Sequence, residues 1–182
     1  LGTSARVLVI GAHPDDEPSA LLALLARGRH VRTAYLSLTR GEGGLNLVGT
    51  ESGEGLGVVR TAEALAARQV DGAEQYFTRA YDFGFARTAA DAQKHWTARE
   101  GPDAVLSDVV TIVRTFRPHV IVSVHDGSPI DGDGQHQEAG RLAREAYARA
   151  AVPAGNPRTW AARALYRDLG FVPVAPYYDN PL

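Results

Sequence analysis

The spacing at which hydrophobic residues recur changes repeatedly along this chain. Short apolar runs, rich in β-branched residues and bounded by glycine, proline or charged residues, are typical of buried strands. Between these runs, apolar residues recur every three or four positions, as on one face of a helix. The expected strands are Arg6–Gly11, Val31–Leu38, Gln75–Ala80, Val120–Val124 and one near Ala164–Arg167, and the expected helices are Ser19–Arg27, Val58–Gln69, Asp103–Phe116 and Gln135–Ala151.

Alternation of strands and helices predicts βαβ units around a parallel sheet. Because such crossovers are right-handed, we expect an α/β, Rossmann-like fold: a doubly wound, mainly parallel sheet of order 3-2-1-4-5 with helices on both faces. The first and fourth strands are then neighbours. Residues 1–182 are expected to form a single domain, with an irregular, proline-containing tail at 152–182 that either wraps the sheet or begins a truncated segment.

Composition narrows the classes of partner and cofactor. A formal charge of −2 over 182 residues gives no basic field, so neither nucleic acid nor an anionic membrane surface is expected as a partner. No apolar run approaches the roughly 20 residues of a membrane span. Because the chain has no cysteine, any metal must be held by nitrogen and oxygen ligands.

One imidazole and two carboxylates follow the first strand directly, in the run AHPDDE at 12–17. Open α/β sheets place their ligand sites at the carboxyl ends of strands. A catalytic zinc ion takes histidine and carboxylate ligands, and a hydrolase also needs a base that takes a proton from water. On a tight turn, Asp15 and Asp16 can divide these two tasks. The alternative is an aspartate helix cap beside an incidental His13.

A second candidate segment follows the fourth strand. A glycine-rich, acidic loop begins at His125 and leads into a helix whose first turn carries His136. If the first and fourth strands are adjacent, His136 can reach an ion held by His13 and Asp16. These residues would complete a two-histidine, one-carboxylate set with an open coordination position.

The AHPDDE run, together with the distant segment GQHQEAG at 134–140, resembles the LmbE-like or PIG-L superfamily of zinc-dependent de-N-acetylases. That superfamily includes N-acetylglucosaminyl-phosphatidylinositol deacetylase, and the resemblance covers most of residues 7–151. It implies that His13, Asp16 and His136 bind Zn²⁺ and that Asp15 is the general base. A site of this kind also accepts other divalent first-row metals.

The resemblance also implies residues that bind substrate. A Gly-Glu loop after the second strand is matched around Glu42, and an Arg-x-x-Glu on the following helix is matched by Arg60 and Glu63. In similar sugar deacetylases, that arginine and an aspartate after the third strand contact the substrate, which implies Arg60 and Asp82 here. Glu42 either lines the site or only solvates the glycine loop.

One position departs from the family pattern. Many relatives carry a second histidine three residues before the zinc-binding one, where it is thought to stabilise or protonate the tetrahedral intermediate, and this chain has Asp133 there. An ionised aspartate would repel a developing oxyanion. Three interpretations follow: Asp133 is protonated, another group such as His125 fills the role, or activity is impaired.

These features predict a metal-dependent amidohydrolase that removes an N-acetyl (N-acyl) group from an amino sugar or glycoconjugate. The alternatives are a catalytically impaired, metal-containing glycan-binding module and a hydrolase of another acyl bond. The expected partner is a small-molecule or glycan substrate, and no feature of the sequence sets the oligomeric state. Leu1 in place of methionine indicates a processed, trimmed or incomplete chain, so cytoplasmic and exported localisation are both compatible with the sequence.

Overall fold

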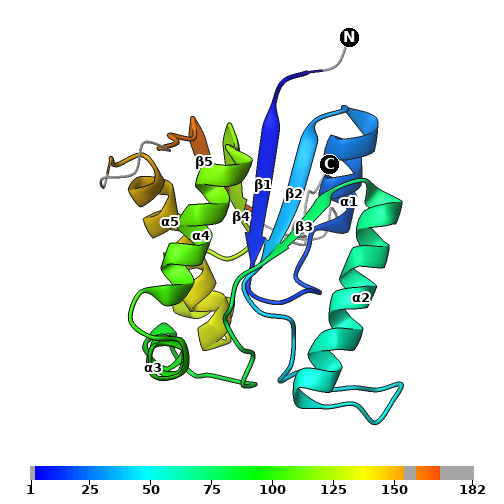
Figure 1. Ribbon diagram of the computed structural model, residues 1–182, viewed down its shortest axis with the longest axis vertical. Coiled ribbons are helices and arrows are strands. Elements are labelled where there is room, and N and C mark those ends of the chain that lie inside the picture. The colour runs from blue at the N-terminus through cyan, green and yellow to red at the C-terminus, as the bar shows by residue number, and fades with distance from the viewer. Residues whose placement is uncertain (1–2, 154–158, 169–182) are drawn as a thin grey trace, which may run out of the picture.

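A five-stranded, all-parallel sheet forms the centre of the protein in the computed structural model, which describes residues 3–153 and 159–168 (Figure 1). The strands lie in the order β3-β2-β1-β4-β5. The predicted fold class and strand order are confirmed, including the strand inside the proline-containing tail, whose residues 154–158 and 169–182 lie outside the described part. The strands are β1 (Arg6–Gly11), β2 (Arg32–Ser37), β3 (Glu74–Phe77), β4 (Val120–Ser123) and β5 (Ala164–Arg167).

Helices cover both faces of the sheet, as predicted (Figure 1). They are α1 (Ser19–Ala23, continued by a π-helical turn at Leu24–Gly28), α2 (Gly53–Asp71), α3 (Ala89–Glu100), α4 (Ala104–Phe116) and α5 (Gly134–Ala150), with a 3-10 turn at Pro129–Asp131. None of the helices in the described part is long and apolar enough to cross a bilayer.

Successive side chains of β1 point alternately into the two layers of the core. Val7 and Val9 belong to a buried cluster with Leu22 of α1, whereas Leu8 and Ile10 belong to a larger cluster with residues of α4 and α5. This two-sided burial explains why the strand is continuously apolar rather than alternating.

Two helices differ from the sequence-based expectation. Helix α3 was not predicted, because Ala92 and Trp96 are its only buried residues and its apolar period is therefore weak. Its remaining sequence signal is a capping box between Thr88 and Asp91. Helix α2 begins at Gly53 rather than at Val58. The added turn includes a glycine at 57 that packs against the side chain of Glu42, so a tertiary contact outweighs the low helix propensity of glycine.

Gly11, the last residue of β1, lies directly against Tyr35 of β2. A Cβ atom at position 11 would stand 2.3 Å from Tyr35 Oη. Tyr35 is completely buried, and its hydroxyl donates a 2.5 Å hydrogen bond to the carbonyl oxygen of His13. The glycine therefore makes room for a tyrosine that fixes the loop after β1.

Gly11→Ala is expected to lower the free energy of unfolding in urea by about 1–3 kcal/mol, because the added methyl group overpacks the site around Tyr35. Gly55→Ala is the matched control: its Cβ would meet nothing closer than 3.9 Å, and alanine is the better helix former. In Gly11→Ala/Tyr35→Phe the clashing hydroxyl is gone, so the two losses are expected to be less than additive. Fully additive losses would contradict the proposed contact.

Candidate metal centre and active site

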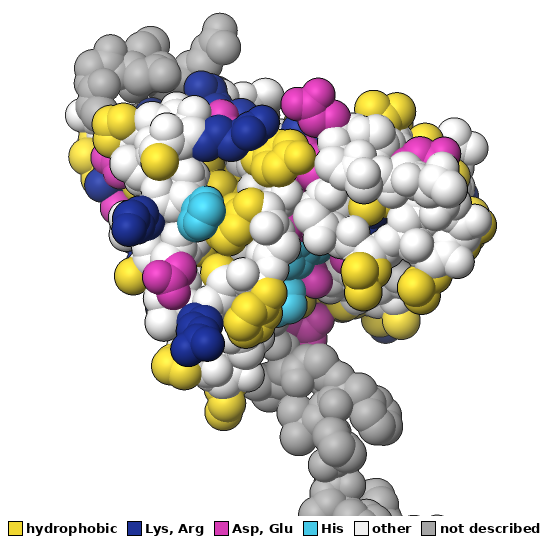
Figure 2. Space-filling view, turned by 90° about the horizontal axis from the view of Figure 1, so that it is seen from below, with side chains coloured by type: hydrophobic (Ala, Val, Ile, Leu, Met, Phe, Trp, Pro, Cys, Tyr) yellow, Lys and Arg dark blue, Asp and Glu magenta, His cyan; other side chains and the backbone are white. Residues whose placement is uncertain are grey.

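The two segments singled out in the sequence meet at the carboxyl edge of the sheet. Strands β1 and β4 are parallel neighbours, with Val9 opposite Val122, so the loops that follow them run together. This edge lies at the lower ends of the strands in Figure 1. Figure 2 views the molecule from below and shows histidine and acidic side chains in the hollow near the centre of that face.

His13, Asp16 and His136 each offer one ligand atom, and these three atoms lie within 4.8 Å of one another. His13 Nδ1 is 3.1 Å from His136 Nε2, which is 3.5 Å from Asp16 Oδ1. Bonds of about 2.0–2.2 Å to a tetrahedral zinc ion place neighbouring ligand atoms roughly 3.3–3.6 Å apart. The donor set and its spacing therefore fit a divalent cation such as zinc.

The two carboxylate oxygens of Asp16 have different surroundings. Oδ2 accepts hydrogen bonds from the backbone N–H groups of Ala12 and His13, at 2.9 and 2.8 Å, and lies 3.1 Å from His125 Nε2. Oδ1 is left to face His136. Burial opposes ionisation, but the hydrogen bonds with His125 and His13 outweigh it and hold the pKa of Asp16 well below its usual value. Asp16 is therefore an anion whose orientation is fixed.

The two candidate histidine ligands have different surroundings. His136 Nδ1 lies 3.2 Å from the carbonyl oxygen of Asp131, so a proton there leaves Nε2 free to bind a metal. Burial lowers the pKa of His136, against the attraction of Asp16. Burial also disfavours a charged His13, but its hydrogen bond with Asp16 outweighs this effect and raises the pKa of His13.

Asp15 lies outside the ligand set, with a side chain that is 68% exposed. Its Oδ2 is 2.6 Å from Nη2 of Arg60, which comes from α2. The glycine loop after β2 makes room for this guanidinium, because Cβ atoms at Gly41 and Gly44 would stand 2.7 and 2.5 Å from Arg60 Nη1. The adjacent carboxylates thus occupy different places. Asp16 belongs to the ligand cluster, by which we mean His13, Asp16 and His136, and Asp15 lies beside this cluster.

Asp82 is buried between the ligand cluster and the start of α5. Its Oδ1 accepts hydrogen bonds from Gln135 Nε2 and Gly84 N, at 2.8 and 2.9 Å, and its Oδ2 is 3.9 Å from His13 Nε2. Because Gln135 Nε2 also donates to the carbonyl oxygen of Gly84, the orientation of this amide is well defined. The other amide atom, Gln135 Oε1, is buried and accepts no hydrogen bond from the described residues.

Glu42 is buried and does not line the candidate site. Its Oε2 accepts hydrogen bonds from the backbone N–H groups of Arg40 and Asp82, both at 3.1 Å. This placement favours a role in holding the glycine loop against the segment after β3 rather than direct contact with substrate.

Asp133 and His125 hold positions that bear on the departure from the family pattern. Asp133 is the N-cap of α5, and its Oδ1 accepts a 2.7 Å hydrogen bond from Gln135 N. The His125 ring stacks on the His136 ring, with centroids 4.1 Å apart and planes at 8°. Because His125 also contacts Asp16, it lies behind the ligand cluster, and it does not line the cavity in front of that cluster.

A cavity of about 450 Å³ opens in front of the ligand cluster. It brings together most of the residues that the sequence singled out, whereas Glu42 and His125 lie behind its walls. The lining includes His13, Asp15, Asp16, Arg60, Asp82, Asp133 and His136, together with Gly43, Gly44, Leu45, Gly84, Phe85 and Gln135.

The sequence analysis missed several residues that position this site. Arg68 of α2 is almost completely buried and binds Glu17, the last residue of AHPDDE, at 3.1 Å, as well as Asp71 at 2.6 Å. Its guanidinium also lies over the Tyr35 ring. Gln135 was overlooked beside the candidate ligand His136. For Arg68, one signal was available in the sequence: it lies about two helical turns after Arg60 on the same helix, which places both arginines on one face.

Comparison with known proteins finds relatives over the whole site region. The PIG-L family, described as GlcNAc-PI de-N-acetylase, matches residues 8–147. A 1D-myo-inositol 2-acetamido-2-deoxy-alpha-D-glucopyranoside deacetylase of Geodermatophilus obscurus is 32% identical over 167 residues, covering 85% of this chain and 56% of the relative. The diacetylchitobiose deacetylase of Thermococcus kodakarensis is 30% identical over 153 residues, covering 83% and 52%. The chain spans little more than half the length of these relatives.

Solved structures share the fold at lower identity. The N,N'-diacetylchitobiose deacetylase of Pyrococcus horikoshii has a TM-score of 0.61 at 23% identity, covering 82% of this chain and 51% of its own. GalB, the 4-carboxy-2-hydroxymuconate hydratase of Pseudomonas putida, has a TM-score of 0.63 at 22% identity, covering 87% and 62%. A fold shared by a deacetylase and a hydratase does not by itself decide the reaction. The family match spans both loops that carry the candidate ligands, and the chain belongs to the PIG-L, or LmbE-like, family of de-N-acetylases.

Proposed function

We propose that this protein is a zinc-dependent hydrolase that removes the N-acetyl group from an N-acetylglucosamine-type sugar or glycoconjugate. The observation that carries the proposal is a two-histidine, one-carboxylate ligand set with a second carboxylate, Asp15, beside it in the same cavity. The two curated relatives named above are deacetylases of compounds of this kind, and the matched region contains every candidate ligand.

In this mechanism, Zn²⁺ held by His13, Asp16 and His136 would act as a Lewis acid toward the acyl carbonyl and would lower the pKa of water at the site. Asp15 takes a proton from a water molecule while the oxygen atom of that water molecule attacks the carbonyl carbon. The same carboxyl group then gives the proton to the leaving nitrogen as the C–N bond breaks. The products are acetate and a free amine.

The neighbours of Asp15 support this division of tasks. Asp16 cannot readily exchange roles with Asp15, because its Oδ2 already has three hydrogen-bonding partners. Arg60 holds Asp15 through one N–H group and has further donors that can bind a hydroxyl or carbonyl oxygen of the sugar. We therefore assign Arg60 to both base positioning and substrate binding, and Asp82 to the support of His13.

Asp15→Asn is expected to reduce acetate release from N-acetylglucosamine-containing disaccharides by about 10²–10⁴-fold, because the amide cannot take the proton. The variant has nearly the same shape, so its metal content is expected to match that of the wild type. Asp103→Asn, which changes an exposed carboxylate outside the catalytic cavity, is the control.

Acetate release that is unchanged in Asp15→Asn would exclude this residue as the base. Wild-type protein that binds the disaccharide without releasing acetate would favour the glycan-binding module. Release of acetate from O-acetylated but not N-acetylated sugars would favour a hydrolase of another acyl bond.

His136→Ala is expected to lose tightly bound zinc, because it leaves two protein ligands in place of three. Elemental analysis after dialysis against a weak chelator measures the zinc content, and His30→Ala, at an exposed position, is the control. Retention of one zinc ion per chain in His136→Ala would show that the ligand set is wrong.

His125→Phe separates positioning from proton transfer. The phenyl ring keeps the stack on His136 but removes the nitrogen that contacts Asp16. We expect zinc affinity, measured by competition with a chromogenic chelator, to fall about 10–100-fold, as for other residues that orient metal ligands. Unchanged zinc affinity with a large loss of kcat would instead identify His125 as the acid that replaces the histidine missing at position 133.

A further inference from the structure

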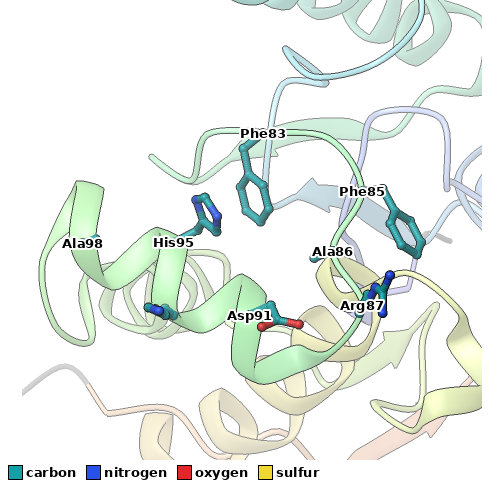
Figure 3. A pocket seen from close by; sticks show the side chains of 8 residues that line it. Phe83, Phe85, Ala86, Arg87, Asp91, His95 and Ala98 are labelled. Carbon is teal, nitrogen blue, oxygen red and sulfur yellow. The ribbon is translucent and has the colours of Figure 1, made fainter.

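A second cavity adjoins the catalytic one and has no part in the chemistry above. It has a volume of about 520 Å³ and lies between residues 83–87 and helix α3 (Figure 3). Phe85 lines both cavities, so they are neighbours across a single side chain. A volume of this size is typical of sites that take small ligands.

Aromatic side chains give this second cavity an apolar wall. Phe83 stacks on His95 of α3, with ring centroids 4.1 Å apart and planes at 13°. Figure 3 shows these two rings on one side of the cavity and Phe85 on the other. The Phe85 side chain is 74% exposed. An exposed phenylalanine beside a cavity favours a ligand that covers it, and the flat C–H face of a ring is a suitable surface.

Two positively charged side chains at the same cavity have no carboxylate partner among the described residues. Arg87 and Lys94 both line it, are exposed, and form no ion pair with any carboxylate of residues 3–153 and 159–168. Asp91 is the acidic residue of the lining, and its Oδ2 is already bound by the backbone N–H and the hydroxyl of Thr88, at 3.2 and 2.8 Å. With two cations and one carboxylate, this lining carries a net positive charge, which complements an anionic ligand.

The charges of the two cavities are opposite in sign. The catalytic cavity is lined by four aspartates, at 15, 16, 82 and 133, and by a single arginine at 60, so its charge stays negative even with the proposed divalent cation bound. The second cavity offers two cations and one carboxylate that is already engaged. A substrate that spans both is therefore expected to carry its negative charge at a distance from the amide that is cleaved.

We propose, building on the deacetylase function proposed above, that the second cavity is a subsite for the ring that follows the N-acetylated sugar, and that it selects a ring bearing a carboxylate or phosphate group. The N-acetyl sugar occupies the catalytic cavity. The next ring crosses Phe85 and packs on the wall formed by Phe83, and its anion pairs with Arg87 and Lys94. The substrate class is an acidic glycoconjugate.

Three matched disaccharides test the charge preference. N-acetylglucosamine is β1,4-linked to glucose, to glucuronic acid or to glucose 6-phosphate, so the compounds differ only at one carbon of the second ring. We expect kcat/KM for at least one acidic compound to be about tenfold higher than for the neutral one. The two acidic arms distinguish a carboxylate from a phosphate ligand. Equal values for all three compounds in the wild type would overturn the proposal.

Substitutions locate the source of that preference. Arg87→Gln/Lys94→Gln is expected to reduce the acidic-to-neutral ratio of kcat/KM to about one. Arg29→Gln removes the same kind of charge from an exposed position between α1 and β2, and is expected to keep the wild-type ratio. A double variant that keeps the wild-type ratio would overturn the assignment of Arg87 and Lys94.

A binding measurement separates the subsite from catalysis. Lys94 is the only lysine of the chain, so an amine-acylating reagent followed by peptide mass spectrometry reports directly on its accessibility. We expect the preferred acidic disaccharide at saturation to slow acylation of Lys94 about tenfold, and the neutral one to slow it much less. Arg87→Gln should weaken this protection. Absence of protection by both acidic compounds would overturn the subsite even if acetate is released, whereas protection without acetate release would overturn the deacetylase function alone.

Discussion

The carboxylate of Asp16 divides its two oxygen atoms between two tasks, and the rest of the candidate metal centre depends on that division. Oδ2 is held by two backbone N–H groups from its own loop and by His125 from the loop after β4. Oδ1 is thereby turned toward His136. This arrangement requires β1 and β4 to be parallel neighbours, because only then do the two loops leave the sheet at the same edge.

Support for this centre comes from both layers of the fold. On one side, Tyr35 fixes the carbonyl oxygen of His13, and Arg68 binds Glu17, so the AHPDDE loop is attached to β2 and α2. On the other side, Gln135 at the start of α5 holds Asp82. These contacts orient the candidate ligands before any metal binds, which is the condition for a well-defined coordination geometry. Asp15, exposed and paired with Arg60, is the member of the motif that lies outside the candidate ligand set.

The sequence predicted the sheet well because β1 is buried on both faces and carries four consecutive apolar residues, and because β4 carries a β-branched apolar run. It predicted the candidate ligand set because the chemistry of AHPDDE is local and the adjacency of β1 and β4 follows from general rules of topology. Helix α3 escaped prediction because most of it faces solvent. The contact between His125 and Asp16 joins residues 109 positions apart, and no periodicity in a sequence reports side-chain orientation over such a separation.

X-ray absorption at the zinc edge of the zinc-loaded protein tests the central claim most directly. The account predicts a first shell of nitrogen and oxygen atoms at about 2.0–2.2 Å, with the multiple scattering that marks two imidazole rings. His13 and His136 are the expected source of those rings. A shell of oxygen atoms without imidazole scattering would place the ion elsewhere among the acidic residues and would contradict the proposed centre.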